Sequence, residues 1–147
     1  MKMKKVTSLL AMTVAAVMAM TGCGGNDAAD DSADAGETYT VGIIQQLEHP
    51  ALDQATKGFE DKLTELLGDK VKFDYQNAQG EQTNCTTIAT KFVSNDVDLI
   101  MANATTALQT AAAATSDIPI VGTSVTDYVT AGVVESNEAP GKNVTGV

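Results

Sequence analysis

The chain has 147 residues, of which 44% are hydrophobic and 19% charged, as in a globular domain rather than a disordered chain. Its 19 acidic residues outnumber the 9 basic ones, which gives a formal net charge of −10. Because so acidic a chain repels phosphate backbones and anionic lipid, nucleic-acid binding is disfavoured, and any membrane attachment is expected to depend on an anchor.

The first predicted element is a secretory signal peptide over residues 1–22. A lysine-rich start is followed by an apolar run over 6–20, which is shorter than the ~20 residues of a membrane-spanning helix. Met20-Thr21-Gly22-Cys23 then resembles the lipobox of bacterial lipoproteins. The resemblance implies cleavage before Cys23 and lipidation of that cysteine, whose acyl chains would anchor the protein to a membrane. The alternative is a plain signal peptide with an incidental cysteine.

The next segment, residues 23–37, is predicted to be a flexible tether. Between 24 and 37 it holds Gly, Asn, Ala, Ser and five acidic residues, with no large apolar side chain. Such a segment cannot bury enough surface to offset its ordering entropy, and its like charges keep it extended. The folded domain is therefore expected to span residues 38–147.

The folded domain opens with a predicted strand and a long predicted helix. Tyr39–Gln45 is rich in β-branched residues, as in a buried strand. Pro50 suits the first turn of a helix, and Gly68 is expected to end that helix in a left-handed conformation. The spacing between them places one set of apolar residues on a single helix face: Leu52, Ala55, Phe59, Leu63 and Leu66.

Strands and helices continue to alternate along the rest of the chain. The predicted strands are Val71–Tyr75, Asp98–Met101, Ile118–Val121 and Asn143–Val147; the predicted helices are Gln82–Ser94, with Cys85, Ile88, Ala89 and Phe92 inward, and Thr105–Ala114. Pro119 indicates either an edge strand or a strand start. Short connections between alternating elements predict an α/β fold, with a parallel sheet of about five strands and helices on both faces.

The predicted binding region lies beyond the carboxyl ends of these strands, where small molecules bind in open parallel sheets. Uncharged donors and acceptors dominate there, which favours reversible binding of a polar small molecule over catalysis. Each candidate also has a structural alternative. Thr105 or Asn103 could cap the following helix, Asp127 could hold its own turn, and His49 could lead into the helix at Pro50.

Other chemistries lack their motifs. The glycines form no phosphate-binding pattern, and one histidine with two distant cysteines cannot make a zinc site. We therefore predict no metal, no cofactor and no catalytic residue. A lipoprotein hydrolase using His49 with Ser124 is a weaker alternative, because no G-x-S-x-G turn presents the serine. A Cys23–Cys85 disulfide is formally open, but lipidation explains Cys23 better and Cys85 suits a small core position.

Several separate motifs resemble the ABC transporter substrate-binding family, which includes proposed tryptophan and tyrosine binders. The resemblance covers Tyr39 to Val147 and rests on Val41-Gly42-Ile43-Ile44-Gln45, Glu48-His49-Pro50-Ala51-Leu52-Asp53, Gly58-Phe59, Asn77-Ala78-Gln79-Gly80, Val97-Asp98-Leu99-Ile100, Val125-Thr126-Asp127 and Gly141-Lys142-Asn143-Val144-Thr145-Gly146-Val147. It implies a type I periplasmic-binding fold, in which two α/β lobes close on a ligand. Residues 38–147 would form the first lobe, with the second lobe missing.

The resemblance also implies a set of ligand-binding residues. By position these are Gln45, Leu47, His49, Asn103, Ala104, Thr105, Thr123, Ser124, Thr126 and Asp127. Helix N–H groups with Thr105 and Ser124 would receive a ligand carboxylate, Asp127 an ammonium group, and Leu47 an apolar side chain. Tyr128 departs from the family, in which a proline is frequent at this position.

The expected function is that of an extracytoplasmic solute-binding lipoprotein, held at the cell membrane by Cys23. Its expected ligand is a small polar solute. Within that class we expect an amino acid, and among amino acids an aromatic one. The protein would deliver this ligand to the permease of an ABC importer, and it would not be an enzyme. The remaining alternative is a sensory or scaffold lipoprotein of the same fold.

Overall fold

The computed structural model describes residues 38–147. The expected signal peptide over 1–22, the lipidation site Cys23 and the tether over 23–37 lie outside the described residues. Within the described residues, every helix is too short or too polar to cross a membrane.

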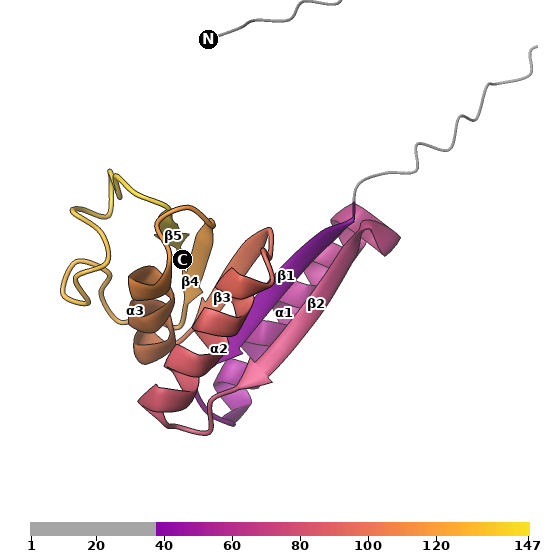
Figure 1. Ribbon diagram of the computed structural model, residues 1–147, viewed down its shortest axis with the longest axis horizontal. Helices are drawn as coiled ribbons and strands as arrows, with labels where there is room; N and C mark the ends of the chain where they lie inside the picture. Colours follow the sequence, from indigo (N-terminus) through magenta and orange to yellow (C-terminus); the bar gives the residue numbers. More distant parts are fainter. Residues whose placement is uncertain (1–37) are drawn as a thin grey trace, which may run out of the picture. The chain divides into compact units, whose positions relative to one another are not determined.

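Five strands form one parallel sheet with the order β2-β1-β3-β4-β5 (Figure 1). Their bounds are β1 (Tyr39–Gln45), β2 (Val71–Asn77), β3 (Leu99–Asn103), β4 (Ile120–Thr123) and β5 (Val144–Gly146). All four neighbouring pairs are parallel. The predicted α/β class with a sheet of about five strands is therefore confirmed.

Helices cover both faces of the sheet, as predicted. They are α1 (Pro50–Leu67), α2 (Gln82–Ser94) and α3 (Thr105–Ala114), with a short 3₁₀ helix η1 (Gly68–Lys70). On one face α1 packs over β1 and β2 around Ile43 and Met101. On the other face α2 and α3 enclose the larger core around Phe92, Ile100 and Leu108, and Figure 1 shows α2 in front of the sheet and α1 behind it.

The buried face of α1 differs from the predicted stripe at its carboxyl end. Leu66 is 64% exposed, so its predicted place in the stripe is wrong. Leu67 packs against the core instead. The reason lies in the end of the helix, because Gly68 adopts φ 57 and ψ −131, outside the left-handed helical region, and continues into η1. The chain then passes through η1 and enters β2 at Val71, the predicted start of that strand.

The fourth strand begins at Ile120, two residues after the predicted start at Ile118. Pro119 cannot donate to a ladder, and its carbonyl accepts a hydrogen bond from Ile100 N just before β4 begins. The Ile118 N–H group donates a hydrogen bond to Thr115 Oγ1, in the turn after α3. Since β4 lies between β3 and β5, Pro119 marks a strand start rather than an edge strand.

Candidate functional site

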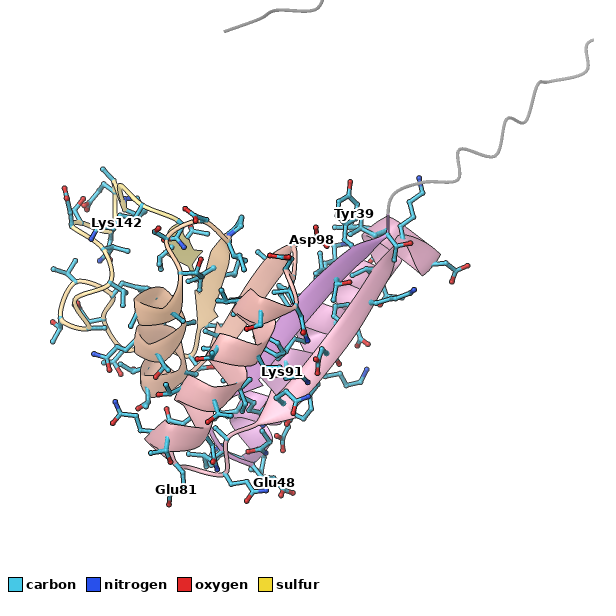
Figure 2. All side chains as sticks on the ribbon, viewed as in Figure 1. Tyr39, Glu48, Glu81, Lys91, Asp98 and Lys142 are labelled. Carbon is cyan, nitrogen blue, oxygen red and sulfur yellow. The ribbon has the colours of Figure 1, made fainter. Side chains whose placement is uncertain are left out.

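The carboxyl ends of the inner strands form one row across the sheet. Gln45 of β1 is in register with Asn103 of β3, and Asn103 is in register with Thr123 of β4. In Figure 2 this end of the sheet is the one with the labelled residues Glu48, after β1, and Glu81, before α2. The labelled residues Tyr39 and Asp98 lie at the opposite end. The structure therefore brings the loops after β1, β3 and β4 to a common rim.

The start of α3 has no side-chain cap. Its N-cap residue is Ala104, which has no side chain able to accept a hydrogen bond from the first turn. The predicted capping alternatives are therefore wrong: Thr105 is already inside the helix, and the Asn103 side chain binds α1. An uncapped helix start presents N–H groups and a partial positive charge, which suit a carboxylate.

Backbone strain is concentrated at the same rim. Ala104 has φ 89 and ψ 161, a region that only glycine occupies readily. Ser124 and Gln79, in the loops after β4 and β2, also have positive φ angles of 57 and 55. Strained residues cluster where function requires a particular geometry, so this rim is the candidate site.

A buried polar network ties the ends of β1 and β3 to α1. Thr56 Oγ1 donates to Gln45 Oε1 at 2.8 Å and accepts from Asn103 Nδ2 at 2.9 Å. Gln45 Nε2 also donates to Asp53 Oδ1, at 2.5 Å, and Asn103 Nδ2 to Leu52 O, at 2.8 Å. Gln45 and Asn103 are both fully buried, so in this structure they hold the rim together and do not face solvent.

Thr56, the centre of this network, is not among the site residues predicted from the sequence. A signal was present, because the position lies four residues after Leu52 and three before Phe59, on the inward face of α1. Thr56 is 4% exposed and is the buried residue of that helix. A polar residue on an apolar stripe indicates a buried hydrogen-bond partner, and that signal could have identified it.

The loop after β1 holds two further predicted residues, Leu47 and His49. The His49 side chain is exposed and caps α1, with Nδ1 accepting a hydrogen bond from Ala51 N at 3.2 Å. The structural alternative for His49 is therefore confirmed. Leu47 is half-buried, and its carbonyl oxygen accepts a hydrogen bond from Gln45 Nε2 at 3.0 Å. Contact of either residue with a ligand stays a prediction.

The loop after β4 presents Ser124, Thr126 and Asp127 as exposed residues, whereas Thr123 is half-buried. Asp127 Oδ1 accepts a hydrogen bond from Thr130 N at 2.6 Å, which confirms that this residue holds its own turn. The same hydrogen bond lowers the pKa of the Asp127 carboxyl below its ordinary value of 3.8. The carboxylate therefore stays charged and accessible at neutral pH, as an ammonium partner must be.

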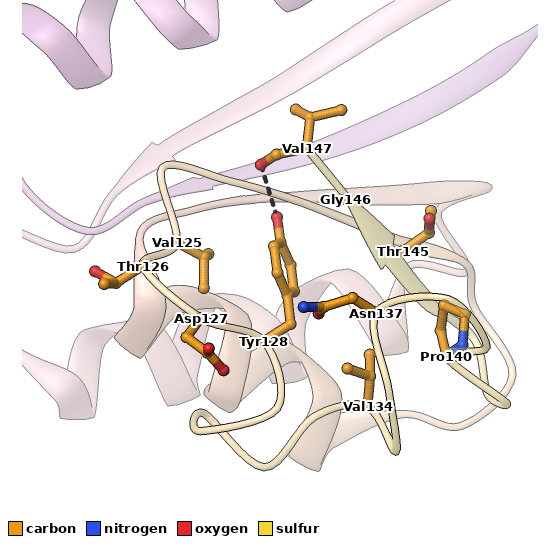
Figure 3. A pocket seen from close by; sticks show the side chains of 10 residues that line it. All are labelled: Val125, Thr126, Asp127, Tyr128, Val134, Asn137, Pro140, Thr145, Gly146 and Val147. Carbon is orange, nitrogen blue, oxygen red and sulfur yellow. Dashed lines mark hydrogen bonds between the residues drawn. The ribbon is translucent and has the colours of Figure 1, made fainter.

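A cavity of about 280 Å³ opens beside this loop (Figure 3). Thr126 and Asp127 line it on one side, and Thr145 and Val147 lie at its β5 side. Tyr128 attaches the loop to the sheet, since its hydroxyl shares its one proton between Gly122 O, at 2.8 Å, and Val147 O, at 3.0 Å. The cavity volume and its mixed lining are compatible with part of a small-molecule site.

The described residues contain no group of three or more His, Cys, Asp or Glu side chains that could hold a metal ion. Cys85 is a free, fully buried thiol on the inward face of α2, the small core position predicted from the sequence. Cys23, with which a disulfide is formally possible, lies outside the described residues 38–147. The rim residues themselves offer hydrogen bonding, at the start of α3, and charge pairing, at Asp127.

Comparison with known proteins gives consistent matches. Residues 40–147 match the family described as ABC transporter substrate binding protein. A tyrosine-binding protein from Clostridioides difficile strain R20291 is 46% identical over 153 residues, covering 99% of this chain and 44% of the relative. The chain thus spans less than half the length of that relative.

Two solved structures resemble the described fold. The ligand-free, open structure of a Clostridium difficile substrate binding protein with adhesive properties has a TM-score of 0.72 and 44% identity, covering 74% of this chain and 38% of that one. A Streptococcus pneumonia ABC domain in complex with L-Trp also has a TM-score of 0.72, with 38% identity, covering 76% of this chain and 38% of that one. Together with the family match and the shared α/β architecture, these findings show that the chain belongs to the ABC transporter substrate-binding protein family.

Proposed function

We propose that this chain forms one wall of a binding site for a free amino acid, with an aromatic side chain as the favoured ligand class. The observation that carries the proposal is the uncapped start of α3 on the strand-end rim. Relatives that bind tyrosine and L-Trp support the ligand class. Transport is proposed as the purpose of this binding, through delivery of the ligand to an ABC permease.

The charges at the rim match the two ends of an amino acid. The first turn of α3, with Thr105, would receive the carboxylate together with Ser124 of the neighbouring loop. Asp127 is exposed and negatively charged, and it would receive the ammonium group. Leu47 would pack against the apolar part of the ligand. Thr123 and Thr126 would complete the wall.

The proposal extends to the parts of the protein outside the described residues. Residues 1–22 would direct export, lipidation of Cys23 would anchor the protein on the extracytoplasmic side of the cell membrane, and residues 23–37 would hold the domain away from the lipid. A second lobe would close over the rim, as expected for a two-lobed binding fold. The share of the relatives that this chain spans, 44% and 38%, supports a single lobe over 38–147.

We propose binding rather than catalysis because the side chain of His49 caps a helix. His49 Nδ1 accepts the hydrogen bond from Ala51 N, so that nitrogen serves as the cap of α1 rather than as a base for Ser124. The comparisons point the same way, since the named relatives bind substrates.

Calorimetric titration of the protein with its proposed second lobe, using tyrosine, tryptophan and alanine, tests the proposal. We expect saturable binding of tyrosine or tryptophan, weaker for alanine, and a loss of about tenfold in affinity for Asp127→Asn. Asparagine keeps an oxygen for Thr130 N, so the turn is retained while the charge is removed. Asp117→Asn, at an exposed site after α3, is the matched control and should leave the affinity unchanged. No binding of any of the three amino acids would reject the proposed ligand class.

A further inference from the structure

Two consecutive residues at the carboxyl end of β3 carry an energetic cost. Ala104 adopts a backbone conformation that favours glycine, with φ 89 and ψ 161. The preceding Asn103 has a buried side-chain oxygen, Oδ1, that finds no donor among the described residues. A strained backbone and an unpartnered buried oxygen persist only where the surrounding structure enforces them.

The surrounding structure does enforce them, through a network of five hydrogen bonds. Asn103 O accepts from Gln46 N at 3.2 Å, and Ala104 N donates to Thr123 O at 3.0 Å, so both neighbouring strand ends are tied to this turn. The Asn103 side chain donates to Leu52 O and to Thr56 Oγ1 of α1. The Thr56 hydroxyl in turn donates to Gln45 at the end of β1.

We propose that Thr56 and Asn103 form a positioning device that holds Ala104 in its strained conformation and thereby fixes the direction of the first turn of α3. This inference rests on the proposed function, because the fixed helix start is the part of the site that would receive the ligand carboxylate. Thr56 and Asn103 are both buried in this structure and do not face solvent at the rim. They act through Ala104, whose strain is the cost of a preorganised site.

If Thr56 and Asn103 hold Ala104 in a strained conformation, Ala104→Gly should raise the stability of the fold and lower the affinity for the ligand. Ala104→Gly removes the strain, so the melting temperature should rise, by about 4 °C for a domain of this size. Glycine also allows other backbone conformations at the start of α3, so affinity for tyrosine or tryptophan should fall about fivefold. Asp96→Gly is the matched control, because it replaces another positive-φ residue, φ 48, at the opposite end of the sheet and should leave affinity unchanged.

Hydrogen exchange in the ligand-free chain tests the device independently of ligand binding. Thr56→Val keeps the shape of the side chain but removes the hydroxyl, so the amides of Gln46 and Ala104 should exchange at least tenfold faster. Thr56→Ser keeps the hydroxyl and should restore slow exchange. Thr64→Val, at an exposed position of the same helix, should have no effect.

The outcomes separate this device from the proposed function. Unchanged exchange in Thr56→Val, or unchanged affinity in a stabilised Ala104→Gly, would overturn the device. If the wild-type protein with its proposed second lobe bound no amino acid, the proposed function would fail, while the exchange rates in Thr56→Val and Thr56→Ser would still decide whether Thr56 holds the turn. If Thr56→Val did not fold, the melting temperature and the affinity of Ala104→Gly would decide it.

Discussion

The Tyr128 ring packs against Gly122, the third residue of β4, and its hydroxyl donates to the carbonyl oxygen of that glycine at 2.8 Å. A Cβ atom at Gly122 would lie 2.8 Å from Tyr128 Cε1 and 3.0 Å from Leu108 Cδ2. The strand therefore needs a residue without a side chain here. This contact holds the loop that presents Thr126 and Asp127 against the sheet.

The first prediction follows from that contact. Gly122→Ala should lower the free energy of unfolding by about 1–3 kcal/mol, because the methyl group forces Tyr128 or Leu108 out of place. Gly58→Ala is the control, since Gly58 lies within α1 with open space around it. This variant should raise the free energy of unfolding by about 0.5–1 kcal/mol, because alanine is more favourable than glycine within a helix. Urea denaturation of both variants measures the two changes. Equal effects in the two variants would contradict the packing of Tyr128 on β4.

The second prediction concerns the Tyr128 hydroxyl alone. Tyr128→Phe keeps the ring but removes the hydrogen bonds to Gly122 O and Val147 O. We expect a loss of about 1 kcal/mol in the free energy of unfolding. Amides of residues 124–128 should exchange faster with solvent, because the loop is less firmly attached to β4 and β5. Unchanged exchange in this loop would show that packing alone holds it.

The third prediction is a pH dependence at Asp127. The Thr130 N–H group binds the charged form and lowers the pKa of the carboxyl from 3.8, so the folded state holds its proton less tightly than the unfolded state. The stabilising contribution is therefore complete above the ordinary pKa and is lost as pH falls through the lowered one. Asp127→Asn should melt below wild type at about pH 7, and this difference should vanish near about pH 2. A difference that is constant across pH would refute the assignment.

The fourth prediction concerns the thiol of Cys85. Burial raises the pKa of this thiol above 9.0, so the folded state favours the neutral form, and the stability it contributes is lost as pH rises through that raised pKa. In a Cys23→Ser chain, where Cys85 is the remaining cysteine, iodoacetamide should react slowly in the native state. Reaction in urea should be at least about tenfold faster, because unfolding exposes the thiolate. Equal rates would show that the α2 core opens readily.

Part of the candidate site could be predicted from local patterns. Turn and helix-start residues after each strand identified the rim, because parallel strands bring their carboxyl ends to one edge. Whether a rim side chain faces solvent or α1 depends on strand register and helix packing, which local patterns leave open. Gln45 and Asn103 illustrate this, since both lie at the predicted rim yet turn inward to Thr56.

The sequence by itself determined the alternation of strands and helices, the α/β class, the positions of most element starts and the family, because these depend on residue spacing and on motifs in a fixed order. Tertiary structure decided the rest. The strained turn at Ala104, the exposed Leu66 and the Tyr128 contact with β4 all depend on how the elements pack in three dimensions. No single segment encodes this packing between elements.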